Sequence, residues 1–120
     1  MGMYASVRGW LEIAFEQRAV AEQIIARHDD GFYSGGWAFP TAPFNWTLYL
    51  FYGCDIRAGE LPWLRRQVAE LAAMPPVDED NDYPTGLFLV TDEVGFVRTW
   101  QVCDAAVTEH PAPELAWLAQ

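Results

Sequence analysis

The chain has 120 residues, 52% of them hydrophobic and 15% aromatic, and its 17 acidic side chains outnumber its 7 basic ones to give a net charge of −10. This length and apolar content predict a single folded domain over residues 1–120 and exclude a disordered chain. The acidity excludes a non-specific nucleic-acid binder and adsorption to an anionic membrane, because both need clustered cations. Three explanations of the acidity remain: a basic partner, a cationic ligand, or solubility alone.

Residues 4–14 alternate in character, which predicts a strand that is buried on one face. Its core face would carry Ala5, Val7, Leu11 and Ile13, and its other face Arg8, Trp10 and Glu12. Residues 15–29 then change to a helical period, with Val20, Ile24 and Ile25 on the buried side and a stop at Gly31.

Residues 34–40 predict a short aromatic strand, and residues 45–57 predict the strongest strand of the chain. The nearly continuous apolar run from Trp46 to Tyr52 favours a strand that is covered, at least in part, on both faces. Residues 61–74 predict a second helix, with Pro62 in its first turn and Leu61, Leu64, Val68 and Leu71 along one stripe.

The last third of the chain predicts a polar loop, a hairpin and a tail. Residues 78–82 form the loop, and residues 87–91 and 96–103 form two strands joined across residues 92–95. Residues 110–113, with two prolines, break the chain before a short helix at 114–118. The resulting order, β-α-β-β-α-β-β, predicts an α+β fold with a mostly antiparallel sheet and two helices packed on one face.

Such a layout leaves one face of the sheet without helices. Arg8, Trp10 and Glu12 would share that face with Thr47, Tyr49 and Phe51. Large rings mixed with charges are typical of a recognition surface. The alternative is a second small core, in which the same rings lie under the loops and the tail.

No pattern in the sequence predicts a metal site. The carboxylates of Asp78, Asp80 and Asp82 have the spacing of a calcium loop, but Tyr83 stands where the turn glycine belongs and Leu89 where the bidentate glutamate belongs. A solvated loop or an acidic contact patch remains. His28, His110, Cys54 and Cys103 are too far apart in sequence to predict a zinc site.

No catalytic constellation is recognisable either. Either cysteine would need a nearby base, and no oxyanion loop or nucleotide-binding glycine loop accompanies them. The chain contains no lysine, which excludes Schiff-base chemistry. Asp55 and Arg57, two residues apart on one strand, predict either an ion pair that fixes the turn or a polar contact at the rim of the sheet.

No secretion signal is recognisable in residues 1–10, and no apolar run is long enough to predict a membrane-spanning helix. We interpret Met1 and Gly2 as a cloning remnant before a native Met3. The two cysteines are therefore expected to be reduced thiols, and the protein is expected in the cytoplasm.

Four segments resemble the immunity protein 7 family of bacterial polymorphic-toxin systems. They are Val7–Glu12, Tyr33–Trp37, Phe51–Arg57, and Gly86–Val90 ahead of Trp100 and Gln101. Members of that family are small cytosolic α+β proteins, encoded beside a secreted toxin that they neutralise by direct binding. The resemblance implies stoichiometric inhibition of a cognate toxin, either at its active cleft or on a surface beside it, with no catalysis, cofactor or metal.

The partner-binding residues that this function implies lie on the sheet and its rim. They are Arg8, Trp10, Glu12, Trp37, Tyr49, Asp55, Arg57, Asp78, Glu79, Asp80, Asp82, Asp92, Glu93 and Trp100. A cationic toxin cleft would be attracted by the acidic loop and rim. The alternative function is a small-ligand module with a pocket lined by Trp10, Trp37, Tyr49 or Trp100. The third alternative, which the sequence favours least, is an enzyme that uses Cys54 or an Asp/His pair.

Overall fold

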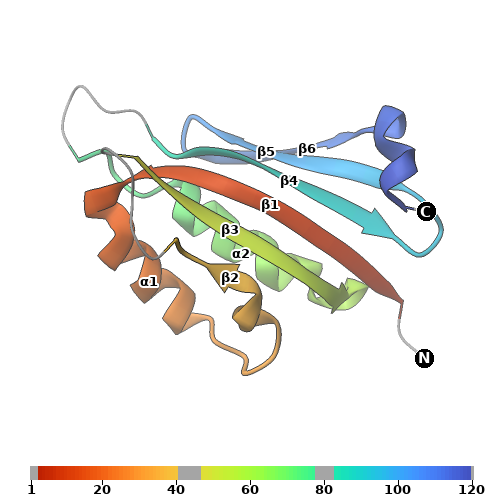
Figure 1. Cartoon of the computed structure of the whole chain (residues 1–120), viewed down its shortest axis with the longest axis horizontal. Helices are drawn as coiled ribbons and strands as arrows, with labels where there is room; N and C mark the ends of the chain where they lie inside the picture. The colour runs from red at the N-terminus through yellow and green to blue at the C-terminus, as the bar shows by residue number, and fades with distance from the viewer. Residues whose placement is uncertain (1–2, 41–46, 78–82, 120) are drawn as a thin grey trace.

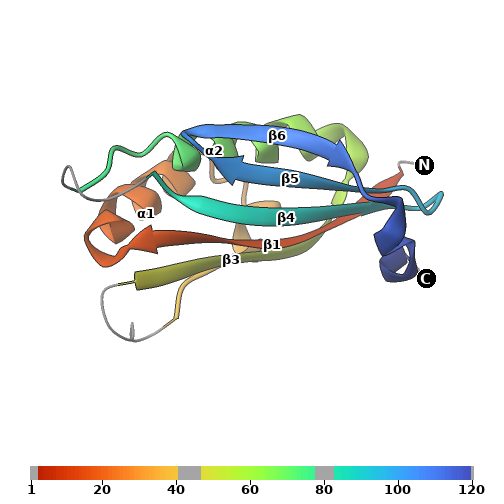
Figure 2. The same cartoon turned by 90° about the horizontal axis from the view of Figure 1, so that it is seen from above.

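Strand β1 (Tyr4–Ala14) lies in the middle of a six-stranded antiparallel sheet with the order β2-β3-β1-β4-β5-β6 (Figures 1 and 2). The structure is a computed structural model that describes residues 3–40, 47–77 and 83–119. The other strands are β2 (Trp37–Ala38), β3 (Thr47–Arg57), β4 (Thr85–Asp92), β5 (Val97–Cys103) and β6 (Ala106–Pro111). The helices are α1 (Arg18–Arg27) and α2 (Leu61–Ala72), and 3-10 turns span Phe15–Gln17, Tyr33–Gly36, Ala58–Glu60 and Pro113–Ala119.

The predicted α+β class is confirmed. Helices α1 and α2 cover one face of the sheet, and the C-terminal 3-10 turn lies on the other side (Figure 1). Strand β1 pairs with β3 along its whole length, from Tyr4 opposite Arg57 to Ala14 opposite Thr47, and it pairs with β4 on its other edge. None of the helices in the described parts of the chain is long and apolar enough to cross a membrane.

The predicted order is one strand short, because β6 follows β5 where the sequence predicts only a break. The hairpin between β5 and β6 turns at Asp104 and Ala105, whose φ angles are +51° and +63°. Two left-handed residues define the turn type that usually has Asn-Gly, so this turn lacks its usual sequence signal. Pro111 ends β6 at the edge of the sheet, where a missing N–H is tolerated.

Three local predictions about the elements are corrected. Val20 is 45% exposed and Ala21 is buried in its place, whereas Ile24 is buried as predicted and Ile25 is partly buried against the core. The short aromatic strand is mostly the 3-10 turn Tyr33–Gly36, followed by the two residues of β2. β3 alternates between buried and exposed side chains, so it is covered on one face and not on both.

The core lies between the sheet and the two helices. Leu11, Leu50, Phe88 and Trp100 contribute from the strands, and Leu61, Leu64, Val68 and Leu71 of α2 face them as predicted. Gln17, immediately before α1, closes one end of this layer. Its Oε1 accepts a hydrogen bond from the Ala14 amide at 2.9 Å, and its Nε2 donates to the Pro75 carbonyl oxygen at 2.9 Å.

Two glycines allow β1 and β4 to approach each other closely. A Cβ atom on Gly9 would lie 2.3 Å from the Leu87 carbonyl oxygen and 2.7 Å from the Phe88 ring. A Cβ atom on Gly86 would lie 2.1 Å from the Trp10 carbonyl oxygen. The shortest distance at each glycine is to a backbone carbonyl oxygen that cannot move without distorting the sheet, so a side chain at either position must displace a strand.

We therefore expect Gly86→Ala to lower the free energy of unfolding by about 1–3 kcal/mol, the usual cost of overpacking. Gly53→Ala is the matched control, because no heavy atom lies within 4 Å of a Cβ built there. That control should be neutral or stabilising by up to about 1 kcal/mol, since alanine restricts the unfolded chain. Urea unfolding of both variants measures the difference, and equal stability would contradict the close approach.

Candidate functional site

The face of the sheet opposite α1 and α2, here called the open face, is the candidate site. Successive side chains of a strand point to opposite faces, so the pairing register places residues of β3, β1, β4 and β5 in rows across it. One row holds Phe51, Trp10, Leu87 and Gln101, and the next holds Tyr49, Glu12 and Thr85. Figure 2 looks onto this face.

The C-terminal turn Pro113–Ala119 covers one end of the open face. Beneath it, Thr91, Val97 and Thr99 are buried although they point away from the two helices. Arg8 fixes the turn, because its Nη2 donates a hydrogen bond to the Leu118 carbonyl oxygen at 3.1 Å. A small buried group therefore forms under the tail at this end, but none of the rings named in the second-core alternative belongs to it.

The other end carries an exposed group of rings. Trp10, Tyr49 and Phe51, here called the aromatic patch, are 38%, 43% and 47% exposed. Trp10 stands opposite Phe51 across β1 and β3, and the Tyr49 and Phe51 rings stack with their centroids 6.4 Å apart. The second-core alternative does not hold for these rings, because the tail leaves them open to solvent.

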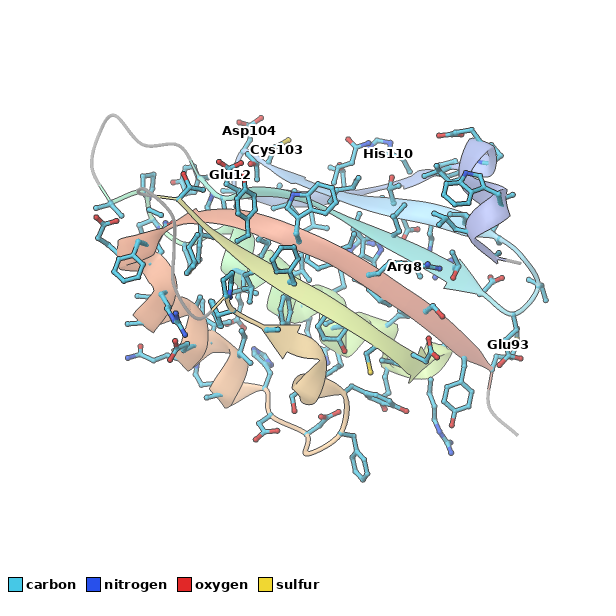
Figure 3. The ribbon with its side chains drawn as sticks, in the orientation of Figure 1. Arg8, Glu12, Glu93, Cys103, Asp104 and His110 are labelled. Atoms are coloured by element: carbon cyan, nitrogen blue, oxygen red, sulfur yellow. The ribbon has the colours of Figure 1, made fainter. Side chains whose placement is uncertain are left out.

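Glu12 is the acidic member of this end of the face. It stands opposite Tyr49, is exposed, and makes no hydrogen bond or ion pair with any residue that the structure describes. Figure 3 shows it toward one end of β1, with Arg8 toward the end that carries the C-terminal turn. The patch therefore combines three rings with one carboxylate that has no partner among the described residues.

Asp55 and Arg57 do not form the predicted ion pair. Asp55 Oδ1 instead accepts a hydrogen bond from the Ser6 hydroxyl at 2.5 Å, across β1 and β3. Arg57 lies over the Tyr4 ring, with 6.0 Å between its Cζ and the ring centroid, and the Tyr4 side chain raises the pKa of the guanidinium above its ordinary value. Both residues lie on the open face, at the end near the C-terminal turn. This position is at the rim of the sheet, where the second interpretation of the pair puts a polar contact.

Asp92 and Glu93 have structural partners at the same end. Asp92 Oδ1 accepts hydrogen bonds from the Val94 and Phe96 amides, each at 3.0 Å, and so closes the turn between β4 and β5. Glu93 Oε1 accepts one from the Tyr4 amide at 2.8 Å. The two residues line a polar hollow of about 480 Å³ together with Ser6, Arg8, Asp55 and Thr91.

Trp37 and Trp100 were predicted for partner binding, and the structure places both on the helix side. Trp100 is 1% exposed, and its Nε1 donates to Glu109 Oε1 at 3.0 Å. Trp37 packs edge-on against Tyr52, with 4.8 Å between ring centroids, and donates from Nε1 to Gln67 Oε1 at 3.1 Å. Trp10 and Tyr49 lie on the opposite face, so these four rings do not share one pocket.

Sequence reasoning missed a second hollow, between α1 and residues 29–39. It measures about 450 Å³ and is lined by Ile25, Ala26, Trp37 and Phe39 among others. The loop beside it is braced by Asp29, whose pKa is lowered by hydrogen bonds from the Ser34 hydroxyl and the Gly31 amide. This loop presents Phe32 with 81% of its surface exposed, and no periodic pattern in the sequence predicts that position.

The remaining predicted residues contribute no site in the described structure. Asp78, Glu79, Asp80 and Asp82 lie outside the described residues. Cys54 and Cys103 are free thiols on different strands. Within residues 3–40, 47–77 and 83–119, no group of three or more His, Cys, Asp or Glu side chains is placed to hold a metal ion.

No protein-family model, no curated protein and no solved structure matches the chain. The immunity protein 7 resemblance and the function that it implies therefore stay predictions.

The aromatic patch should contribute little to folding, because its rings are already in contact with water. We expect Trp10→Ala and Tyr49→Ala each to lower the free energy of unfolding by less than about 1.5 kcal/mol, the lower end of the range for fully burying a large apolar side chain. Trp100→Ala, in the core, should cost about 3–5 kcal/mol. Chemical denaturation measures all three, and comparable losses would show that the patch is part of the core.

Proposed function

We propose that this chain is a binding protein that acts by stoichiometric contact with a partner protein, and that the open face of the sheet is its contact surface. The observation that carries the proposal is the aromatic patch, in which three rings are exposed together on paired strands. Exposed apolar groups of this kind, gathered rather than scattered, mark interaction sites. Tryptophan and tyrosine are also enriched among the residues that dominate binding energy.

The sheet suits the patch to this purpose because it holds the rings in place before a partner arrives. β1 and β3 pair over eleven residues each, and their other face is packed against the helices. A surface that is already ordered loses less conformational entropy on binding. Most of the free energy of ring burial is then retained as affinity.

The resemblance to the immunity protein 7 family suggests the class of partner, a bacterial toxin whose gene lies next to the gene for this chain. The net charge of −10 supports a cationic partner, because opposite charges accelerate association. A toxin that acts on nucleic acid carries such a surface to bind phosphates. Inhibition would then follow from occupancy of that surface, with no chemical step and in the cytoplasm.

The test is co-expression of this chain with the protein encoded beside it. We expect relief of toxicity and a complex of defined stoichiometry by size-exclusion chromatography. Trp10→Ala combined with Tyr49→Ala should weaken that complex at least roughly 30-fold, which corresponds to about 2 kcal/mol for a hot-spot pair. Isothermal titration calorimetry on the purified proteins gives the number.

Phe32→Ala is the matched control for that pair. Phe32 is the most exposed of the large hydrophobic residues described, but it lies beside α1 and not on the open face. We expect its removal to leave the affinity within about twofold, as for a residue outside an interface. Persistent toxicity with no complex would refute the function, and equal losses in both variants would refute the assignment of the surface.

A small-ligand function is supported by one observation, the hollow of about 450 Å³ beside α1. This volume lies within the range of small-molecule sites, and Ile25, Trp37 and Phe39 supply apolar lining. A ligand bound there should raise the unfolding temperature of the parent protein in a thermal-shift screen. Ala26→Phe, which places a ring at the hollow from an exposed helix position, should abolish that shift, and a shift that survives would locate the ligand elsewhere.

A further inference from the structure

We infer that the aromatic patch receives an arginine side chain of the partner protein, with Glu12 as the carboxylate that pairs with its guanidinium group. This inference rests on the proposed function and specifies the chemistry of the partner at its point of anchorage. It follows from the placement of one acidic side chain among three rings.

Glu12 occupies a corner of a four-residue arrangement on β1 and β3. Trp10 is two residues before it on the same face, Tyr49 stands directly opposite, and Phe51 lies diagonally across the strands. Directly opposed side chains on one face have Cβ atoms about 5 Å apart, and diagonal ones about 7–8 Å apart. A side chain that contacts the rings therefore also comes within reach of the carboxylate.

The described residues supply no cation to this corner. Glu22 pairs with Arg18, Glu70 with Arg27, and Glu109 with Arg65 and Arg98, whereas Glu12 has no such partner. The two arginines of the open face lie toward its tail end and have other contacts. Arg8 bonds to the tail, and Arg57 packs on Tyr4.

Docking of a purely apolar partner on the patch would be unfavourable for this reason. It would remove the Glu12 carboxylate from water without a compensating partner, and an unpaired buried charge is strongly destabilising. A partner that covers the rings must therefore satisfy the carboxylate, and a cation does so most strongly because its hydrogen bonds to a carboxylate are charge-assisted. The same cation is attracted by the electron-rich faces of the rings.

Arginine fits the arrangement better than lysine does. Its planar guanidinium stacks flat on an aromatic ring and still presents parallel N–H groups to a carboxylate, so it satisfies both features at once. The ammonium group of lysine is compact and strongly hydrated, and it loses more solvation on leaving water. We therefore expect the partner surface to present an arginine at the centre of the contact.

The test uses three N-acetylated, C-amidated tripeptides, Gly-Arg-Gly, Gly-Lys-Gly and Gly-citrulline-Gly, titrated into the full chain. The readout is the NMR resonance of the Trp10 indole N–H, assigned by its loss in Trp10→Phe. The arginine peptide should shift this resonance saturably, the lysine peptide should bind at least threefold more weakly, and the uncharged citrulline peptide should give no saturable shift.

Glu12→Gln should raise the dissociation constant of the arginine peptide at least fivefold. Glu60→Gln makes the same charge change in the turn before α2 and should leave the constant unchanged. Equal effects of the two variants would show attraction by net charge only and would overturn the inference. So would the absence of a saturable shift with the arginine peptide, or equal affinity for the lysine or citrulline peptide.

Failure of this inference can be told apart from failure of the proposed function. A stable complex with the adjacent protein that is weakened by loss of Trp10 and Tyr49 but not by Glu12→Gln would retain the function and remove the arginine anchor. Saturable binding of the arginine peptide without any complex would retain the anchor chemistry and remove the proposed partner.

Discussion

The close packing of β1 against β4 is the constraint on which the rest of the structure depends. Gly9 has no side chain, and the Phe88 ring lies in the space that a Cβ atom there would enter. Phe88 in turn contacts Trp37 and Trp100, with ring centroids 6.1 Å and 6.4 Å away. This ring cluster fills the layer between the sheet and α2, and it fixes which side of each central strand faces the core.

The open face exists because one side of each central strand faces the core and the other side does not. Side chains alternate along β1, so burial of Val7 and Leu11 directs Arg8, Trp10 and Glu12 to the opposite side. A shift of one residue in the pairing would reverse this and bury the charges. The register of β1 therefore positions the candidate site as firmly as it positions the core.

Much of the fold could be predicted because the two-residue period of the strands and the 3.6-residue period of the helices are both clear in the sequence. The alternation from Tyr4 to Ala14 and the helical stripe of α2 define the sheet face and its cover, and they correctly place Trp10, Glu12 and Tyr49 on the open side. The predicted α1 face is wrong at one position, because the small Ala21 is buried while the larger Val20 is exposed. β6 was missed because its turn uses Asp104 and Ala105 in a conformation that their side chains do not favour.

The face of the sheet on which Trp37 and Trp100 lie could not be predicted from the sequence pattern of their own short segments. Each depends on the register of pairing with the neighbouring strand, which places Trp100 opposite Phe88 and Trp37 opposite Tyr52 on the helix side. Both tryptophans look suited to recognition in the sequence, but in the fold Trp100 is a core residue and Trp37 packs against the core. The coverage of Thr91 and Val97 by the C-terminal turn is likewise a tertiary contact, and no local pattern in either strand indicates it.

The strong negative charge acquires a physical role once the open face is known. Exposed rings gathered on a sheet favour self-association, and like charges on two copies of the chain oppose it. Repulsion of this kind disfavours a second copy of the chain as the occupant of the open face, and the same negative charge supports the proposal of a basic partner surface.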